Sequence, residues 1–504
     1  MPTKSRKKKG SKKKSAPKFR LSPPRIVMAA LALIVLLALG GLAFWLINEP
    51  AADVYPEASA QDGWKLNKPA ENHQIEGYVS AASVNPGSTL NFHIGCKSGA
   101  FSAEIYRMGW YDGEGASRKG RVDPRPCRPE TMPEPDRNTG LVNAEWPLNF
   151  RLHIPSDWQP GVYLAKLTDK EGYQTYVPFT VRTPKPHNAY LFVHAINTDN
   201  AYNTWGGNSL YSGFTPNLNI TRAVKVSLNR PFLQYDGKDD GSGDFLTWEY
   251  SMVKFLEEYN YKVDYATDID IQENPSLLQK YKAVILTGHD EYWSKQMRQG
   301  YVDALNHDVN LAIFAANTAY RPVRFEPDPL TGRPNRIMVD YKSSLLDPYM
   351  NRQDQSETTP GNWHDRPLYK PESEILGIEY RDETENSGGR SADLVVNDDQ
   401  NWMFHGTGLK NGDTIPGVLG YEYEQFSDAY PHPANVDLVF HSPINSEDHG
   451  KDFADASYYQ LPRGGAQVFD AGTMEWSWGL DPDRPQYSPV LTRITKNILD
   501  RFGL

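Results

Sequence analysis

The sequence predicts an α/β fold with an N-terminal all-β domain: a β-sandwich followed by a mostly parallel α/β sheet, preceded by one transmembrane helix. Three observations carry this prediction. An unbroken apolar run at 26–47 follows a basic arm at 1–25. Short alternating runs separated by turn residues occupy 71–182. Beyond residue 187, apolar strands alternate with helical patterns up to residue 504, which is typical of a parallel sheet covered by helices.

The N-terminal segment has the features of an uncleaved signal anchor. The run 26–47 carries no charged residue and reaches the roughly 20 residues that span a bilayer. The 11 Lys and Arg of the arm predict a cytoplasmic N-terminus, so a tether at 48–70 and an extracytoplasmic body would follow. The expected location is therefore the plasma (inner) membrane, in single-pass form. Cleavage near Ala51 and Ala52 is the alternative.

Charge and cysteine usage narrow the class of protein. All 63 acidic residues lie beyond the arm, which holds 11 of the 53 basic ones, so the body is acidic and no nucleic-acid surface is expected. In an oxidising compartment Cys96 and Cys127 could form one disulfide around a loop of about 30 residues, or remain two free thiols. No CxxC motif occurs, which leaves zinc ribbons and zinc nucleobase deaminases unsupported.

The elements of the two domains follow from hydrophobic periodicity. Alternating runs at 90–94, 103–107, 161–167 and 176–181 predict the antiparallel sandwich. After the boundary Pro184-Lys185-Pro186, strands are expected at 190–195, 262–265, 283–286 and 311–315, and helices at 245–259, 293–306 and 488–502. The strand pattern resumes at 417–420 and 467–470, after a polar insertion at about 326–412. This order predicts flavodoxin-like or amidotransferase-like layering in a candidate catalytic domain at 187–504.

Four polar and aromatic clusters each follow a predicted strand of this second domain. They occupy 197–211, 288–293, 316–321 and 471–478. In open α/β sheets ligands bind at the carboxyl ends of the strands, so the four clusters should converge on one edge. The alternative for the second cluster is that Asp290 and Glu291 only favour the positive end of the following helix.

The chemistry of these clusters excludes several mechanisms. Both cysteines lie in the first domain, and neither GxSxG nor GxxxxGK[ST] occurs, so no cysteine nucleophile, GxSxG serine or phosphate-binding loop is expected. The nucleophile that remains for hydrolysis is water activated by a metal or a general base. Phenols bind zinc or calcium poorly at neutral pH because their pKa is about 10. A trivalent iron can displace the phenol proton, which makes tyrosinate with carboxylate a coherent donor set for Fe(III).

Six phrases, in order, resemble the large (beta) subunit family of N,N-dimethylformamidase, in its C-terminal-domain-like branch. They are IEGY (75–78), YRMGWY (106–111), AYNTWGG (201–207), GHDEYW (288–293), NTAY (317–320) and GTMEWSW (472–478). The resemblance extends from about residue 70 to the end. It implies an amidase activity that depends on one iron held by two tyrosines and a glutamate in an α/β domain.

Residue by residue, the resemblance implies a specific site. Glu291 is the implied carboxylate ligand, with Tyr211 and Tyr202 as the tyrosine ligands. His289 and Asn317 match residues that polarise the substrate and support the ligands. Glu422 matches an acid/base residue, with Glu424 as its competitor. The alternatives are structural: packing for the tyrosines, a turn-stabilising hydrogen bond for the histidine, and an ordinary surface acid for the glutamate.

The function expected from these observations is a membrane-anchored, dimethylformamidase-like amide hydrolase. One Fe(III) per chain would activate water against a small amide. Other expected partners are the membrane, through one N-terminal helix, and a small subunit or a second copy of the chain; no nucleic acid is expected. Two alternatives remain open: a non-catalytic cell-surface protein that binds a glycan or another partner, and a metal-dependent hydrolase of an envelope polymer.

Overall fold

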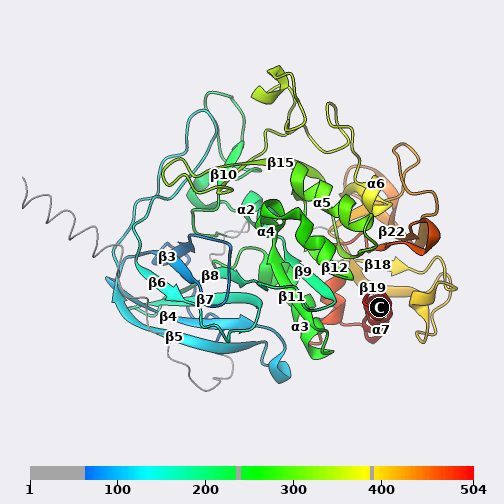
Figure 1. Cartoon of the computed structure of the whole chain (residues 1–504), viewed down its shortest axis with the longest axis horizontal. Coiled ribbons are helices and arrows are strands. Elements are labelled where there is room, and N and C mark those ends of the chain that lie inside the picture. Colours follow the sequence, from blue (N-terminus) through cyan, green and yellow to red (C-terminus); the bar gives the residue numbers. More distant parts are fainter. Residues whose placement is uncertain (1–62, 234–239, 386–390) are drawn as a thin grey trace, which may run out of the picture. The chain divides into compact units, whose positions relative to one another are not determined.

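Strands dominate the structure, a computed structural model that describes residues 63–233, 240–385 and 391–504 (Figure 1). The first group of strands forms two sheets. One sheet has the order β1-β3-β6, with β1 (Ile75–Val79), β3 (Thr89–Cys96) and β6 (Phe150–His153). The other has the order β2-β8-β7-β4-β5, with β2 (Ser83–Val84), β8 (Gln174–Val181), β7 (Gly161–Asp169), β4 (Ala100–Met108) and β5 (Ala116–Pro126).

Alternating side chains form the core between these two sheets. On β3, Leu90, Phe92 and Ile94 are buried, whereas the intervening positions are partly exposed, as expected for a strand with one face turned inward. The Phe92 ring stacks on Phe150 at a centroid distance of 4.6 Å and meets Phe179 of the other sheet edge-on at 6.0 Å. The strands expected within 71–182 are therefore present and pack as two layers.

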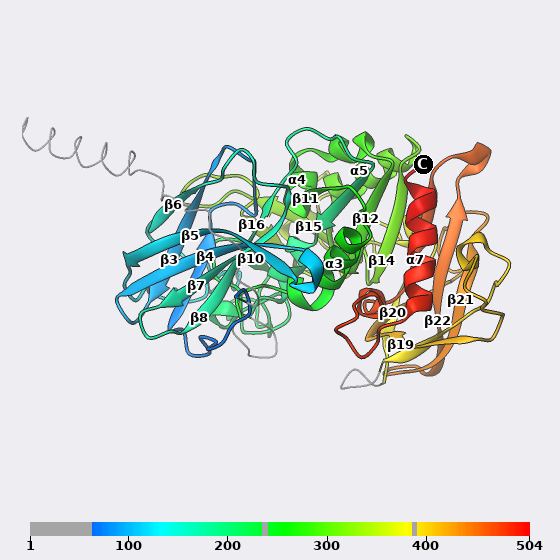
Figure 2. The same ribbon diagram turned by 90° about the horizontal axis from the view of Figure 1, so that it is seen from below.

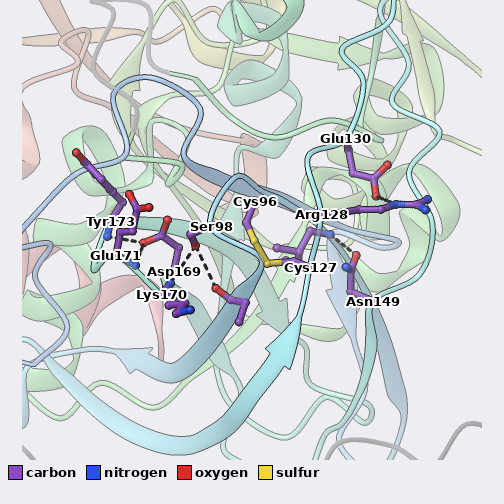
Figure 3. Close-up of a disulfide and its surroundings, with 12 residues drawn as sticks. Cys96, Ser98, Cys127, Arg128, Glu130, Asn149, Asp169, Lys170, Glu171 and Tyr173 are labelled. Carbon is purple, nitrogen blue, oxygen red and sulfur yellow. Dashed lines mark hydrogen bonds and ion pairs between the residues drawn. A yellow bond between two sulfur atoms is a disulfide. The ribbon is translucent and has the colours of Figure 1, made fainter.

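A disulfide joins the two layers (Figure 3). Cys96 is the last residue of β3, and Cys127 directly follows β5 in the other sheet. Their Cα atoms lie 5.7 Å apart, and the sequence separation is 31 residues. The bond therefore settles the alternative that the sequence left open, because neither cysteine is a free thiol.

A seven-stranded sheet forms the centre of the second half, in the order β11-β9-β12-β14-β23-β22-β21. Its strands are β9 (Tyr190–His194), β11 (Val263–Thr267), β12 (Ala283–His289), β14 (Asn310–Ala316), β21 (Asp437–Ser446), β22 (Gly450–Gln460) and β23 (Gln467–Asp470). The first five in spatial order run parallel, whereas β22 runs antiparallel to both of its neighbours, β23 and β21. Figure 2 shows α7 (Pro489–Phe502) beside β14, with β22 and β21 beyond it.

Helices cover both faces of this sheet. On one face, Phe192, Ile285 and Phe314 join a core with α3 (Tyr250–Glu258) and α7. On the other face, Leu286 and Ile313 pack with α5 (Lys295–Leu305). Burial on both faces explains why the sequences of these strands are apolar throughout instead of alternating between apolar and polar residues. The other α-helices are α2 (Ile196–Tyr202), α4 (Asp268–Glu273) and α6 (Ser373–Leu376).

Three smaller sheets complete the second half. One has the order β10-β16-β15-β13, with β10 (Lys225–Ser227), β13 (Tyr292–Ser294), β15 (Arg321–Glu326) and β16 (Ile337–Val339). The two others pair β17 (Glu379–Glu383) with β20 (Glu422–Gln425), and β18 (Ala392–Val395) with β19 (Thr414–Leu419). The short helices are η1 (Tyr111–Gly113), η2 (Trp205–Gly207), the π-helix η3 (Phe245–Glu249), η4 (Pro275–Lys280), η5 (Pro348–Asn351), η6 (Trp402–Phe404), η7 (Pro462–Gly464) and η8 (Trp476–Leu480).

The expected fold class, a sandwich followed by one mostly parallel α/β sheet, is wrong, because the structure is a mixed, sheet-rich fold with several sheets. Residues 417–419 of the expected strand 417–420 belong to β19, which pairs with β18 outside the seven-stranded sheet. β21 and β22 are joined by a short turn, and such a turn permits only antiparallel pairing. The expected domain boundaries stay a prediction.

The predicted membrane anchor is also corrected. Within 63–233, 240–385 and 391–504, no helix is long and apolar enough to cross a membrane. The single-pass location at the plasma membrane is therefore not supported by the structure. The arm at 1–25, the apolar run at 26–47 and most of the tether, on which that prediction rested, lie outside the described residues.

Candidate functional site

A cavity of about 540 Å³ lies where two neighbouring parallel strands end. His289 is the last residue of β12 and Asn317 directly follows β14, and the register pairs His289 with Ala316. All six residues predicted for the site line this cavity. The full lining is Tyr202, Tyr211, Asp244, Thr247, Trp248, His289, Glu291, Asn317, Tyr320, Arg321, Tyr380, Glu383, Tyr421 and Glu422.

The end of β12, where Gly288 is the next-to-last residue, fixes the direction of the side chains there. Gly288 has a φ of +71°, a conformation that costs a non-glycine residue energy, and a Cβ atom there would overlap Trp248. The backbone N–H of Glu291 donates to the Thr198 hydroxyl of α2 over 3.0 Å. On the neighbouring turn Asn317 is itself left-handed, with a φ of 53°. The polar residues after both strands are therefore held by backbone geometry as well as by side-chain contacts.

Two tyrosines converge on the carboxylate of Glu291. The Tyr202 hydroxyl donates to Oε2 over 3.0 Å, and the Tyr211 hydroxyl donates to Oε1 over 2.6 Å. The two phenol rings stack at a centroid distance of 4.3 Å, and the Tyr292 hydroxyl donates to that of Tyr211 over 2.8 Å. Residues that are 80 or more positions apart in the sequence thus bring three hard oxygen donors together.

Positive charges surround the same carboxylate. Nε of Arg321 lies 3.2 Å from Oε1 of Glu291, and Nζ of Lys342 lies 3.2 Å from the centroid of the Tyr211 ring. Burial by itself would raise the pKa of Glu291, but His289, Lys342 and Arg321 outweigh it and lower the pKa to about 2. Burial also lowers the pKa of Lys342 to about 7. Glu291 is therefore an anion at neutral pH, although it is fully buried.

The tyrosines keep their protons unless a cation replaces them. Burial, followed by the charge of Glu291, raises the pKa of both Tyr202 and Tyr211 well above 10. At neutral pH both phenols are therefore neutral hydrogen-bond donors. A trivalent cation placed between the three oxygens would displace these protons, so the donor set fits Fe(III), as the residue types led us to expect. Glu291, Tyr202 and Tyr211 are the residues that could hold it.

A second group lies on the other side of Glu291. Nε2 of His289 lies 3.1 Å from Oε2 of Glu422 and 3.4 Å from Oε2 of Glu291. Nδ2 of Asn317 donates to Oε2 of Glu422 over 3.1 Å. Burial by itself would lower the pKa of His289, but Glu422 and Glu291 raise it to about 10. The imidazole is therefore protonated at neutral pH, and it can give up a proton in the cavity.

Aromatic side chains form the remaining wall. Trp248 stacks on Trp478 at a centroid distance of 5.0 Å, and Tyr320 contacts Tyr380 at 4.8 Å. Trp478 belongs to the fourth predicted cluster, 471–478, from which no residue lines the cavity. Three of the four clusters therefore converge on the cavity itself, while the fourth supports it from behind.

Sequence reasoning missed part of the site. Arg321 and Tyr292 lie in the predicted clusters but carried no predicted role. Lys342, Tyr380 and Glu383 come from the segment 326–412, where no local pattern distinguishes them from surface residues. The competitor Glu424 is fully buried, accepts a hydrogen bond from the backbone of Thr318 over 3.1 Å and does not line the cavity.

Comparison with known proteins gives one extensive match. A family model described as "N,N-dimethylformamidase beta subunit-like, C-terminal" matches residues 102–489, well over half of the chain. No curated protein matches the chain.

Two solved structures show only weak similarity. An uncharacterized protein from Bacillus anthracis str. Ames is 15% identical over 24% of this chain and 97% of its own, with a TM-score of 0.15. A cycloisomaltooligosaccharide glucanotransferase from Paenibacillus sp., complexed with cycloisomaltoheptaose, is 12% identical over 54% of this chain and 34% of its own, with a TM-score of 0.16. TM-scores this low have no bearing on the fold or on the site.

Proposed function

The chain belongs to the N,N-dimethylformamidase beta subunit-like family, and from this premise we propose that it hydrolyses a small amide in the cavity beside Glu291. The observation that carries the proposal is the arrangement of Tyr202, Tyr211 and Glu291 next to the pair of His289 and Glu422. A candidate metal-binding group and a candidate proton-transfer group thus share one cavity. Such a combination is what amide hydrolysis by activated water requires.

The metal in this proposal is one Fe(III), held by Tyr202, Tyr211 and Glu291. When bound, it supplies a Lewis acid for the amide carbonyl and lowers the pKa of a water molecule. Arg321 and Lys342 keep Glu291 ionised and restrain the Tyr211 ring. The protein thereby keeps the donors in place.

The remaining residues would move protons and hold the substrate. Nδ2 of Asn317, aligned by Glu422, would donate to the carbonyl oxygen of the amide. The Glu422 carboxylate would take a proton from the attacking water, while protonated His289 would give one to the amine that leaves. The new C–O bond forms first, the C–N bond breaks once the nitrogen has received its proton, and the products are a carboxylic acid and an amine.

The cavity favours small amides as substrates. Its volume of about 540 Å³ falls in the range of about 300–1,000 Å³ that is usual for small-molecule sites. The cavity wall offers apolar ring surface to N-alkyl or aryl substituents, from Trp248, Tyr320, Tyr380 and Tyr421. A formamide with apolar substituents on nitrogen is small enough for this volume and has apolar groups that suit the aromatic wall.

The proposal is tested by measuring amine release from dimethylformamide and from a panel of N-alkyl and N-aryl amides, using chain loaded with iron. We expect turnover by the wild type and its loss, together with the loss of iron, in Glu291→Gln. Glu447→Gln, on the exposed turn after β21, is the matched control and should keep both. Iron-loaded wild-type protein that releases no amine from any member of the panel would contradict the proposal.

A further inference from the structure

A second cluster of metal-ligating side chains lies outside the cavity and takes no part in the proposed reaction. We call it the His364 cluster: His364, Glu372 and Glu379. One donor atom from each residue lies within 4.8 Å of the others. Nδ1 of His364 lies 3.4 Å from Oε2 of Glu372. Among the residues that the structure describes, no other set of three or more His, Cys, Asp and Glu side chains converges in this way.

The two carboxylates of this cluster are buried and incompletely satisfied. Glu372 is 1% exposed and Glu379 is 8% exposed. Oε1 of Glu372 and Oε2 of Glu379 have no hydrogen-bond partner among the described residues. Burying a carboxylate costs on the order of several kcal/mol unless another charge or hydrogen bonds compensate for the lost hydration. A further cation would therefore stabilise two carboxylates that lie beside one imidazole.

The two neighbouring arginines, Arg298 and Arg381, bind other groups than the carboxylates of this cluster. Arg298 of α5 contacts Glu374 at 3.1 Å and donates to the backbone oxygen of Pro371 over 2.9 Å. Arg381 contacts Asp452 at 3.0 Å. Neither guanidinium makes an ion pair with Glu372 or Glu379 in the described part of the chain. Among the described residues, the imidazole of His364 is thus the cationic group in ion-pair contact with this pair of carboxylates.

We propose that His364, Glu372 and Glu379 bind a divalent transition metal ion, with Zn²⁺ as the expected occupant. One imidazole nitrogen and two carboxylate oxygens are donors that zinc accepts, and three protein ligands leave a fourth position for water. The two negative charges match the charge of the ion. The side chain of His364 is 19% exposed, so the ion can reach the cluster from solvent.

This ion would brace one wall of the cavity. Its ligands come from three places: the loop before α6, the residue that precedes α6, and the first residue of β17. The next residue, Tyr380, lines the cavity and packs against Tyr320, whose ring lies 6.3 Å from that of His364. The site therefore has a structural role that does not depend on the proposed amide hydrolysis.

The test uses the full chain carrying Glu291→Gln, which disables the other metal site, after treatment with a chelator. Titration with ZnCl₂ in a calorimeter should show one Zn²⁺ per chain and a rise in Tm. Co²⁺ in its place should give visible d–d bands from a nitrogen- and oxygen-ligated ion. Both readouts are independent of turnover and of any tyrosinate band, so their failure is distinct from failure of the proposed function.

Ligand variants in the same background locate the ion. We expect His364→Ala and the nearly isosteric Glu379→Gln to weaken Zn²⁺ binding by more than about 100-fold, because even residues that only support metal ligands cost about 10–100-fold. Glu374→Gln, on α6 and outside the cluster, is the control and should bind Zn²⁺ as before. Absence of Zn²⁺ binding, or binding that Glu379→Gln leaves unchanged, would overturn the proposal and leave an ion pair between His364 and Glu372.

Discussion

The hydroxyl of Tyr211 lies 2.6 Å from Oε1 of Glu291, although 80 residues separate them in the sequence. Tyr202 makes the corresponding contact with the other oxygen of the same carboxylate. Both phenol protons point at an anion, and burial raises the pKa of both phenols well above 10. This position is therefore occupied either by two phenol protons or by a cation that displaces them, and the two states differ in measurable ways.

Replacing Tyr211 by Phe distinguishes these states. If the three oxygens hold Fe(III), the wild-type protein should bind about one iron per chain, as proposed above, and show a visible tyrosinate-to-iron band. The band should weaken strongly in Tyr211→Phe, because one phenolate donor is lost. Absorption spectra and elemental analysis of iron-loaded protein measure both effects. Tyr421→Phe is the control, since its ring lines the same cavity, whereas the hydroxyls bonded to Glu291 are those of Tyr202 and Tyr211. An unchanged band in Tyr211→Phe would exclude this ligand set.

Asn317 should affect turnover more than substrate binding. Removing one donor to a carbonyl oxygen typically lowers kcat by about 10²–10³. Asn317→Gly removes the amide without straining the backbone, since glycine tolerates the φ of 53° at this position. Steady-state kinetics on the best amide would show the lower kcat with a nearly unchanged KM. Asn335→Gly, with a φ of 56° and away from the cavity, should keep wild-type kcat; equal rates for both variants would rule out this role.

Gly288 should tolerate no side chain. Its φ of +71° makes alanine cost about 1–2 kcal/mol, and the overlap of the new Cβ atom with Trp248 should add about 1–3 kcal/mol. Gly87 has a φ of +79°, but a Cβ atom added there would have no neighbour within 4 Å, so Gly87→Ala should show only the first cost. Urea unfolding of both variants isolates the steric contribution. Equal losses of stability would show that Trp248 gives way.

A buried pair of carboxyl groups should make stability depend on pH. Burial raises the pKa of Asp470 to about 7, and burial together with Asp470 raises the pKa of Glu424 well above its usual range. Between the unfolded pKa values of about 4 and these higher values, the folded state binds more protons than the unfolded state. The stability that this pair contributes is therefore complete below about pH 4 and is lost as pH rises through about 7.

Asp470→Asn should remove part of this dependence. At pH 8 the variant should be more stable than the wild type by on the order of 2 kcal/mol, with a smaller difference at pH 5. Denaturant unfolding at both pH values measures the change. Asp123→Asn, on the exposed part of β5, should have the same free energy of unfolding as the wild type at both pH values. A wild-type stability that rises from pH 5 to pH 8 together with that of Asp470→Asn would contradict the inference.

Local patterns were sufficient for much of the core and for the place of the cavity, whereas the individual candidate site residues came from the family resemblance. β9, β12 and β14 were predictable because strands buried on both faces must be apolar throughout. The polar residues that follow β12 and β14 were predictable as site residues because parallel strands end at a common edge. The antiparallel hairpin of β21 and β22 was not predictable as part of this sheet, because its pairing depends on contacts distant in the sequence.

The choice between Glu422 and Glu424 shows where sequence reasoning stops. Residues two apart on a strand nominally share a face, so alternation alone could not say which glutamate reaches the cavity. The position of β20 relative to the ends of β12 and β14 decides it: Glu422 meets His289, whereas Glu424 meets the backbone of Thr318. The sequence by itself determined the central parallel strands and the polar residue types at their ends, because both depend on neighbouring residues. The tertiary structure alone decided which distant groups complete the site, such as Lys342 over Tyr211, because such contacts leave no local pattern.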